Sequence, residues 1–234
     1  EVHIGSGLPG FTVVGLPDEA CREARDRVRA ALLSSGAEWP NKKITVNLAP
    51  SSQRKGGVGL DLALAMGILS ASGQMSSDNL AEYSFVAELG LDGSLRPVPG
   101  AAPLVAGLRE TRVVVALPNA REAKVASPRS IHCAATLRDV VLALRGDGEW
   151  LDTSTQEKIQ ASSHIADMSD VRGQPTARLA AEIAAAGSHH ILFVGSPGAG
   201  KTMIAERLPG LLPPLTNEEA VTATMIHSAA GASL

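Results

Sequence analysis

Eight consecutive residues in the last fifth of the chain have the types and spacing that bind phosphate groups. They fit the pattern G-x-x-x-x-G-K-[ST] and are Gly195, Ser196, Pro197, Gly198, Ala199, Gly200, Lys201 and Thr202. Glycines let the backbone curve closely around phosphate oxygens, and successive N–H groups then form an anion-binding nest. In this pattern the lysine reaches the β- and γ-phosphates, and the hydroxyl of the last residue binds Mg²⁺. We therefore predict a site for ATP and Mg²⁺, with Lys201 as the catalytic cation and Thr202 as the metal ligand.

The segments on either side of this loop predict the elements that position it. His190–Val194 is a short apolar, partly β-branched run, which is typical of a buried strand. Residues 203–208 suit a helix, whose amino end would add its positive dipole to the phosphate site. A helix of alanines over 176–186 precedes the strand. Strand, glycine-rich loop and helix in this order are the context expected for the motif.

Strand and helix patterns alternate along the rest of the chain, so we predict the α/β class. Strands are expected over 1–4, 11–14, 43–48 and 112–117 and around 131–132. Helices are expected from near Pro17 to Gly36 and over 60–71, 101–108, 136–144 and 218–228, the last with Thr216 as its cap. A hairpin is predicted in which 83–89 and 94–98 flank the turn Gly90–Gly93.

Two helices carry more specific expectations. The first has an apolar stripe and the opposite-charge pairs Asp18 with Arg22 and Glu23 with Arg27 at i,i+4 spacing; the stripe is Cys21, Ala24, Val28, Ala31 and Leu32. The helix over 60–71 is apolar nearly all round, which indicates burial on most faces. Asp61 is its one charged residue and is expected to be a first-turn acid.

Composition describes an ordinary soluble globular protein. Hydrophobic residues make up 44% and charged residues 19%, which is enough apolar mass for a core. Aromatic residues are only 3%, which argues against a base-stacking platform, and a net charge of −3 gives no global basic footprint. The two cysteines, Cys21 and Cys133, have no metal-ligand spacing, so we expect reduced thiols in a cytoplasmic protein. No membrane-length apolar run and no signal peptide is present.

An acidic pair far upstream of the phosphate loop imitates a catalytic motif. Val13–Leu16 followed by Pro17, Asp18 and Glu19 is similar to the apolar run and acids that bind Mg²⁺ and activate water in P-loop ATPases. This run precedes the phosphate loop, however, and Pro17 breaks the strand before the acids. Helix capping is therefore the interpretation that we adopt for Asp18 and Glu19.

Several further segments occur together, in the same order, in one known family. They are Gly7–Phe11, Gly15–Pro17, Val46–Pro50, Glu88–Gly93 and Asp170–Gln174. On these residues the chain resembles the magnesium-chelatase-like AAA+ ATPases of the YifB/ComM type. The resemblance implies that residues 1–145 form a domain like the second domain of ribosomal protein S5, related to the Lon protease domain. Residues 146–169 would be a linker, and 170–234 would be the truncated start of a P-loop AAA+ domain.

The relationship to Lon raises Ser–Lys proteolysis as an alternative function. By approximate alignment the Lon nucleophile falls at Val58, and its lysine would fall in Pro99–Pro103, where this chain has no lysine. Ser51 and Ser52 have no identified base. The chain is therefore not expected to be a peptidase, and this domain is interpreted as a binding or assembly module.

The resemblance leaves three tasks open for the ATPase. ComM-type members imply a ring-forming homo-hexamer that acts on DNA as a branch-migration helicase. Magnesium chelatase motors instead insert metal into a porphyrin, but they lack the Lon-like domain, so we favour DNA. The third alternative is a non-catalytic protein-docking module. Arg54 and Lys55 would touch DNA phosphates in the first case, although two solvated loop cations are the simpler interpretation.

Three histidines are not interpreted as functional. His189 and His190 are expected to be a polar entry to the strand rather than a metal site, and His227 has no partner that the sequence identifies.

The chain starts at Glu1 rather than Met and ends soon after the phosphate loop, so we expect a fragment. ATP hydrolysis also needs an acid pair and an arginine finger. We find neither here, and the chain alone is expected to be inactive as an ATPase.

Overall fold

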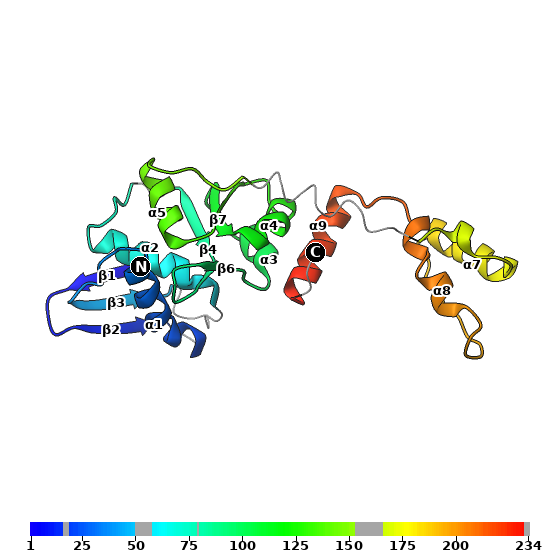
Figure 1. Cartoon of the computed structure of the whole chain (residues 1–234), viewed down its shortest axis with the longest axis horizontal. Helices are drawn as coiled ribbons and strands as arrows, with labels where there is room; N and C mark the ends of the chain where they lie inside the picture. The colour runs from blue at the N-terminus through cyan, green and yellow to red at the C-terminus, as the bar shows by residue number, and fades with distance from the viewer. Residues whose placement is uncertain (16–18, 50–57, 79, 153–165, 232–234) are drawn as a thin grey trace. The chain divides into compact units, whose positions relative to one another are not determined.

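The computed structural model describes residues 1–15, 19–49, 58–78, 80–152 and 166–231 (Figure 1). The chain forms two compact units. The first, the N-terminal unit, comprises Glu1–Glu157 together with Ala220–Leu234, and the second, the phosphate-loop unit, comprises Lys158–Glu219.

The first sheet of the N-terminal unit has three strands. They are β1 (Val2–Gly5), β2 (Gly10–Val14) and β3 (Lys43–Asn47), in the order β1-β3-β2. The middle strand β3 is antiparallel to β1 and parallel to β2, so that Ile44 lies opposite both Ile4 and Phe11. A parallel pair needs a crossover connection, and α1 (Glu19–Ser34) lies in it. These strands confirm the predictions over 1–4, 11–14 and 43–48.

The second sheet is entirely parallel. Its strands are β4 (Tyr83–Val86), β7 (Arg112–Ala116) and β8 (Ser130–Ala134), in the order β4-β7-β8. Helices alternate with these strands, namely α3 (Ala101–Ala106), α4 (Ala120–Ala126) and α5 (Leu137–Arg145). Helices that connect parallel strands define the α/β class, so the predicted fold class is confirmed at that level.

The predicted hairpin is only partly correct. β5 (Glu88–Leu89) and β6 (Leu95–Arg96) are antiparallel and flank the expected turn. Residues 83–86, however, pair with β7 in the parallel sheet. The chain changes sheet at Ala87, whose carbonyl accepts the amide of Leu62 at the start of the preceding helix, α2 (Asp61–Ala71).

The core of the N-terminal unit is organised around α2 (Asp61–Ala71), which contacts α1, β1 and β4. The helix is buried on most faces, as its composition predicts. The predicted stripe of α1 is also confirmed, because all five of its residues are at most 2% exposed. Burial of these aliphatic side chains supplies hydrophobic stabilisation that aromatic residues, which are scarce in this chain, would otherwise provide.

One ion pair is buried in this core. Asp61 is 1% exposed and accepts hydrogen bonds from Nε and Nη2 of Arg27 at 2.7 and 3.0 Å. The amide of Leu89 donates to the same carboxylate at 3.3 Å, so Asp61 joins α1, α2 and β5. The hydrogen bond with Asp61 raises the pKa of Arg27 above its ordinary value. Asp61 is in the first turn of α2 as predicted, but its pairing with Arg27 was not foreseen.

Of the two ion pairs predicted along α1, the structure contains Glu23 with Arg27, at 3.6 Å. The pair of Asp18 with Arg22 lies outside the described residues.

The phosphate-loop unit is small. It contains η3 (Met168–Asp170), α7 (Pro175–Ala186), α8 (Lys201–Ala205) and η4 (Leu208–Leu211), and the boundary between the units falls within α9 (Asn217–Ala229). Thr216 caps α9 as predicted, since its Oγ1 accepts the amide of Glu219 while Glu219 accepts the amide of Thr216. No helix of the described segments is long and apolar enough to cross a membrane.

Candidate phosphate-binding site

The predicted phosphate loop is an exposed turn that leads directly into α8. Gly198 and Gly200 both have φ of 79°, in the left-handed region that glycine adopts without strain. The amide of Ala199 donates to the carbonyl of Ser196 at 3.3 Å and closes the turn. Gly200 is the residue before α8. Gly200, the second glycine of the pattern, and Gly198 therefore occupy positions where the backbone needs positive φ.

Lys201 folds back over the start of the loop. Its Nζ donates to the carbonyl oxygens of Gly195 and Ser196, at 2.8 and 2.7 Å. An ammonium group has three donors, so this arrangement holds a positive charge at the loop while one donor stays available. Thr202, the next residue, is exposed in the first turn of α8. Both groups predicted to bind phosphate and Mg²⁺ are therefore at one end of the loop.

The predicted strand before the loop is wrong for this structure. Residues 191–196 belong to no strand or helix, and Leu192 and Val194 are 85% and 87% exposed. A strand exists only when a neighbour accepts and donates its backbone hydrogen bonds, and the described part of this unit contains no other strand. A helix follows the loop as predicted, but α8 spans Lys201–Ala205 rather than 203–208, and its five residues add little dipole.

Helix α8 is anchored by a small apolar cluster. Met168, Val171, Ala181 and Ile204 are buried, and Phe193 packs against them. Asp170 contributes an ion pair, 3.5 Å from Nη2 of Arg207, which follows α8. Residues 168–171 therefore lie against the segment that follows the loop, which connects the Asp170–Gln174 motif to the phosphate site.

Gln174 is the residue of this site that sequence reasoning missed. Its Nε2 donates to the carbonyl of Ala199 in the loop at 3.1 Å. The only signal in the sequence was its place in the Asp170–Gln174 motif, which carries no chemistry of its own.

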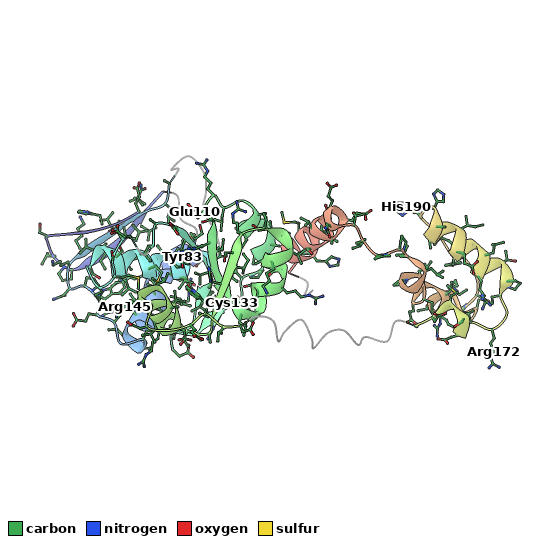
Figure 2. The ribbon with its side chains drawn as sticks, turned by 90° about the horizontal axis from the view of Figure 1, so that it is seen from above. Tyr83, Glu110, Cys133, Arg145, Arg172 and His190 are labelled. Carbon is green, nitrogen blue, oxygen red and sulfur yellow. The ribbon has the colours of Figure 1, made fainter. Side chains whose placement is uncertain are left out.

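Of the remaining candidates, only some lie in the described residues. Arg54, Lys55, Ser51, Ser52 and Asp18 lie outside the described residues. Glu19 begins α1, in agreement with a role at the helix start. His190 and His227 are exposed (His190 is labelled in Figure 2). Within the segments that the structure describes, no group of three or more His, Cys, Asp or Glu residues is placed to hold a metal ion.

Both cysteines are buried in the N-terminal unit. Cys133, labelled in Figure 2, lies in β8, where burial raises the pKa of its thiol to about 11. The thiol of Cys133 is therefore protonated at neutral pH and is a poor nucleophile.

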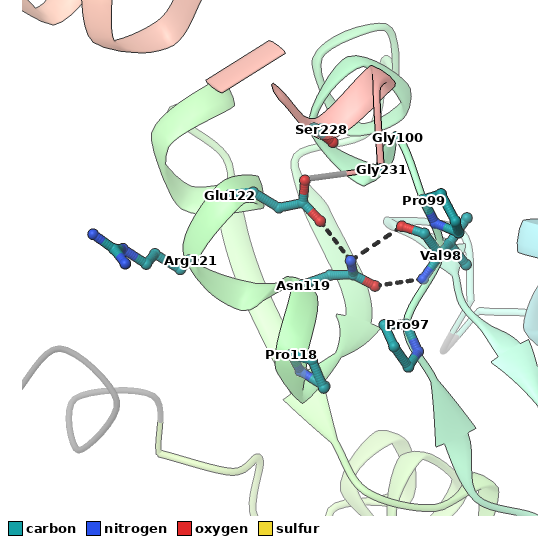
Figure 3. A pocket seen from close by; sticks show the side chains of 10 residues that line it. All are labelled: Pro97, Val98, Pro99, Gly100, Pro118, Asn119, Arg121, Glu122, Ser228 and Gly231. Atoms are coloured by element: carbon teal, nitrogen blue, oxygen red, sulfur yellow. Dashed lines mark hydrogen bonds between the residues drawn. The ribbon is translucent and has the colours of Figure 1, made fainter. Parts of the chain in front are cut away.

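A pocket of about 340 Å³ lies in the N-terminal unit, at the segment Pro99–Pro103 that the resemblance to Lon singled out (Figure 3). Its walls include Pro97–Gly100 and Pro118–Asn119. Asn119 is buried, accepts the amide of Val98 at 2.8 Å and donates to the carbonyl of Val98 and to Glu122. These polar groups satisfy one another. A Cβ on Gly59 would lie 3.2 Å from Val98, so the start of the segment 58–60 lies close to the wall of this pocket.

The fold and the loop together define an α/β protein with a P-loop sequence, and comparison with known proteins gives the family. Residues 1–120 match the family described as "Subunit ChlI of Mg-chelatase", and residues 167–234 match "Magnesium chelatase, subunit ChlI". The chain belongs to this magnesium-chelatase-like family, in its YifB/ComM-type branch.

Individual relatives agree with this assignment. The chain is 43% identical to the competence protein ComM of Haemophilus influenzae over 235 residues, which is 97% of this chain and 46% of ComM. It is 45% identical to YifB of Salmonella typhimurium over 230 residues, or 97% of this chain and 45% of that protein. YifB of Escherichia coli is 44% identical, with 97% and 45% covered. The chain thus spans about half the length of these curated relatives.

Proposed function

We propose that this chain carries the phosphate-binding part of an ATP-driven AAA+ motor. The observation that supports it most directly is the loop Gly195–Thr202, with two glycines at positive φ and the ammonium group of Lys201 held at its carbonyls. Backbone amides of such a loop bind phosphate oxygens, and the lysine neutralises the charge that develops on the γ-phosphate. ATP supplies the phosphoryl group, and the exposed hydroxyl of Thr202 would hold Mg²⁺ against it.

The domain organisation belongs to the same proposal. Residues 1–145 would be a domain like Lon and like the second domain of ribosomal protein S5, residues 146–169 a linker, and 170–234 the first part of the AAA+ module. The two family matches cover residues 1–120 and 167–234, and they support a division of the chain between residues 120 and 167. The first domain would bind or assemble rather than cleave peptides, since Val58 and Pro99–Pro103 cannot supply a nucleophile and its base.

We favour a ring-forming homo-hexamer in the cytoplasm that acts on DNA. The similarity to ComM supports a link to competence, which the name of that relative states. Insertion of magnesium into a porphyrin is the competing function, because the family description names Mg-chelatase.

The deciding measurement is the ATPase rate of the full-length protein, alone, with branched DNA, and with protoporphyrin and Mg²⁺. We expect stimulation by DNA, and Lys201→Ala should lower kcat/KM about 100-fold or more, because it removes a cation aimed at the transferring phosphate. Stimulation by porphyrin alone would contradict the DNA function. A protein partner that survives nuclease treatment in a pull-down, without DNA stimulation, would favour a docking module.

The 234-residue chain by itself should hydrolyse ATP negligibly. The acids after the loop are Glu206, Glu218 and Glu219, and none follows a strand in the described residues. Glu219 is used to cap α9. Steady hydrolysis by this chain in millimolar ATP, abolished by Lys201→Ala, would refute this expectation.

A further inference from the structure

Gln174 has a backbone conformation that its residue type does not favour. Its φ and ψ are 53° and 50°, in the left-handed region, and it is one of two described non-glycine residues with positive φ. It also precedes Pro175, and a proline disfavours helical conformations in the residue before it. Glycine or asparagine would occupy this position with less strain. Local strain of this kind often accompanies a functional constraint.

The side chain of Gln174 has no role in capping α7. Gln174 is the N-cap residue, yet it makes no side-chain hydrogen bond to the first turn of the helix. Its carbonyl alone serves the helix, by accepting the amide of Arg178 at 3.0 Å. Helix capping therefore explains the position of the backbone but not the choice of glutamine.

The side chain is directed at the phosphate loop instead. Nε2 donates to the carbonyl of Ala199 at 3.1 Å, and a Cβ on Gly200 would lie 2.6 Å from the same nitrogen. The positive φ of Gly200 favours glycine there, and any Cβ would also have to displace the Gln174 amide from its hydrogen bond. The side chain of Gln174 therefore contacts both Ala199 and Gly200, and 25 positions separate Gln174 from Ala199 in the sequence.

The contact has a consequence for the next amide. In a planar trans peptide the C=O and N–H groups point in opposite directions. Because Gln174 holds the carbonyl of Ala199, the N–H of Gly200 is turned away from Gln174. We propose that Gln174 is a positioning residue that orients the Gly200 amide as a donor to a phosphate of the bound nucleotide. This inference rests on the proposed nucleotide site.

Two variants separate the amide group from the backbone. Gln174→Met keeps the length and the strained backbone but cannot donate, and Gln174→Gly also removes the strain. Ser188→Gly is the matched control, because Ser188 is the other described non-glycine residue with positive φ, at 51°, and it lies outside the loop. In the full-length protein, the dissociation constant for ADP, the thermal midpoint without nucleotide, and hydrogen exchange of residues 196–201 are measured.

Both Gln174 variants should weaken ADP binding about 5- to 20-fold and speed exchange in the loop, as expected for one lost orienting hydrogen bond. Gln174→Gly should keep or raise the thermal midpoint. Ser188→Gly should do the same and should leave the ADP affinity unchanged.

If both Gln174 variants bind ADP as the unmodified protein does while Lys201→Ala weakens binding, the role of Gln174 is overturned but the nucleotide site is not. A thermal midpoint that falls in proportion to affinity would make Gln174 merely structural. Absence of ADP binding to the unmodified protein would overturn the nucleotide site and this role with it.

Discussion

Two apolar runs of similar composition have opposite surroundings in this molecule. Val113–Ala116 forms most of β7, pairs with β4 on one side and β8 on the other, and is completely buried. Residues 191–194, just before the phosphate loop, have no strand partner in the described residues, and Leu192 and Val194 are almost fully exposed. An apolar run thus has the capacity to be a strand, but neighbouring strands decide whether it becomes one.

The difference extends to the whole of each unit. The described part of the N-terminal unit has two three-stranded sheets, the short β5–β6 hairpin and a large aliphatic core around α2, whereas the main cluster of the phosphate-loop unit has four buried residues. Stability is therefore concentrated in the first unit, and the chemistry that we propose is concentrated in the second. Substitutions at matched positions in the two units test this contrast.

The largest contrast is expected between Val114→Asp and Val194→Asp. Val114 is fully buried in the central strand, so a carboxylate there should destabilise the chain by more than about 4 kcal/mol. Val194 is 87% exposed, and the same substitution should change stability by less than about 0.5 kcal/mol. Urea unfolding followed by circular dichroism measures both. Equal destabilisation by the two variants would mean that residues 191–194 form a buried strand after all.

A smaller contrast lies within α1. Arg27→Ala would leave the buried Asp61 without its cation and should cost about 3–5 kcal/mol. Arg25→Ala is the control on the same helix, because the Arg25–Asp26 pair is exposed, and it should cost less than about 0.5 kcal/mol. Trp39 and Trp150, both in the N-terminal unit, report the urea transition by fluorescence. A loss below 1 kcal/mol for Arg27→Ala would show that Asp61 finds another partner.

The smallest contrast concerns two capping boxes of the same design. Thr136 caps α5 with Asp139, and Thr216 caps α9 with Glu219. Thr136→Ala should cost about 1 kcal/mol, because α5 packs on the core of the N-terminal unit. Thr216→Ala should leave the main transition unchanged and speed hydrogen exchange at residues 217–220 only. The comparison fails if both variants shift the main transition equally.

The cap of α9 should also depend on pH. Hydrogen bonds from the amide and the hydroxyl of Thr216 lower the pKa of Glu219 below its ordinary value. Because the pKa of Glu219 is lower in the folded state, ionised Glu219 contributes its full stabilisation of the cap above the ordinary glutamate pKa, about 4.3. That stabilisation is lost as the pH falls through the lowered pKa of the folded state. Hydrogen exchange of residues 217–220 should therefore show extra fraying below about pH 4 that Thr216→Ala lacks.

Local patterns predicted most of the N-terminal unit. The stripe of α1, the burial of α2 and the strand of β7 each depend on residues close in sequence, and the structure contains all of them. The Thr216 cap in the phosphate-loop unit was predicted for the same reason. The prediction of a long hairpin over 83–98 was wrong because residues 83–86 pair with β7 in another sheet. The periodicity of a sequence indicates a strand but not the strand with which it pairs. Arg27 and Asp61 are 34 positions apart, and their pairing arises from packing of α1 on α2.

At the phosphate loop the division between sequence and tertiary structure is clear. The sequence alone determined the identity and order of the loop residues, because a phosphate-binding turn needs glycines, a lysine and a hydroxyl at fixed spacing. Only the tertiary structure decided that residues 191–194 lack strand partners and that Gln174 holds the carbonyl of Ala199. Both depend on which distant backbone groups meet, since hydrogen bonds between separate segments form only after the chain has folded.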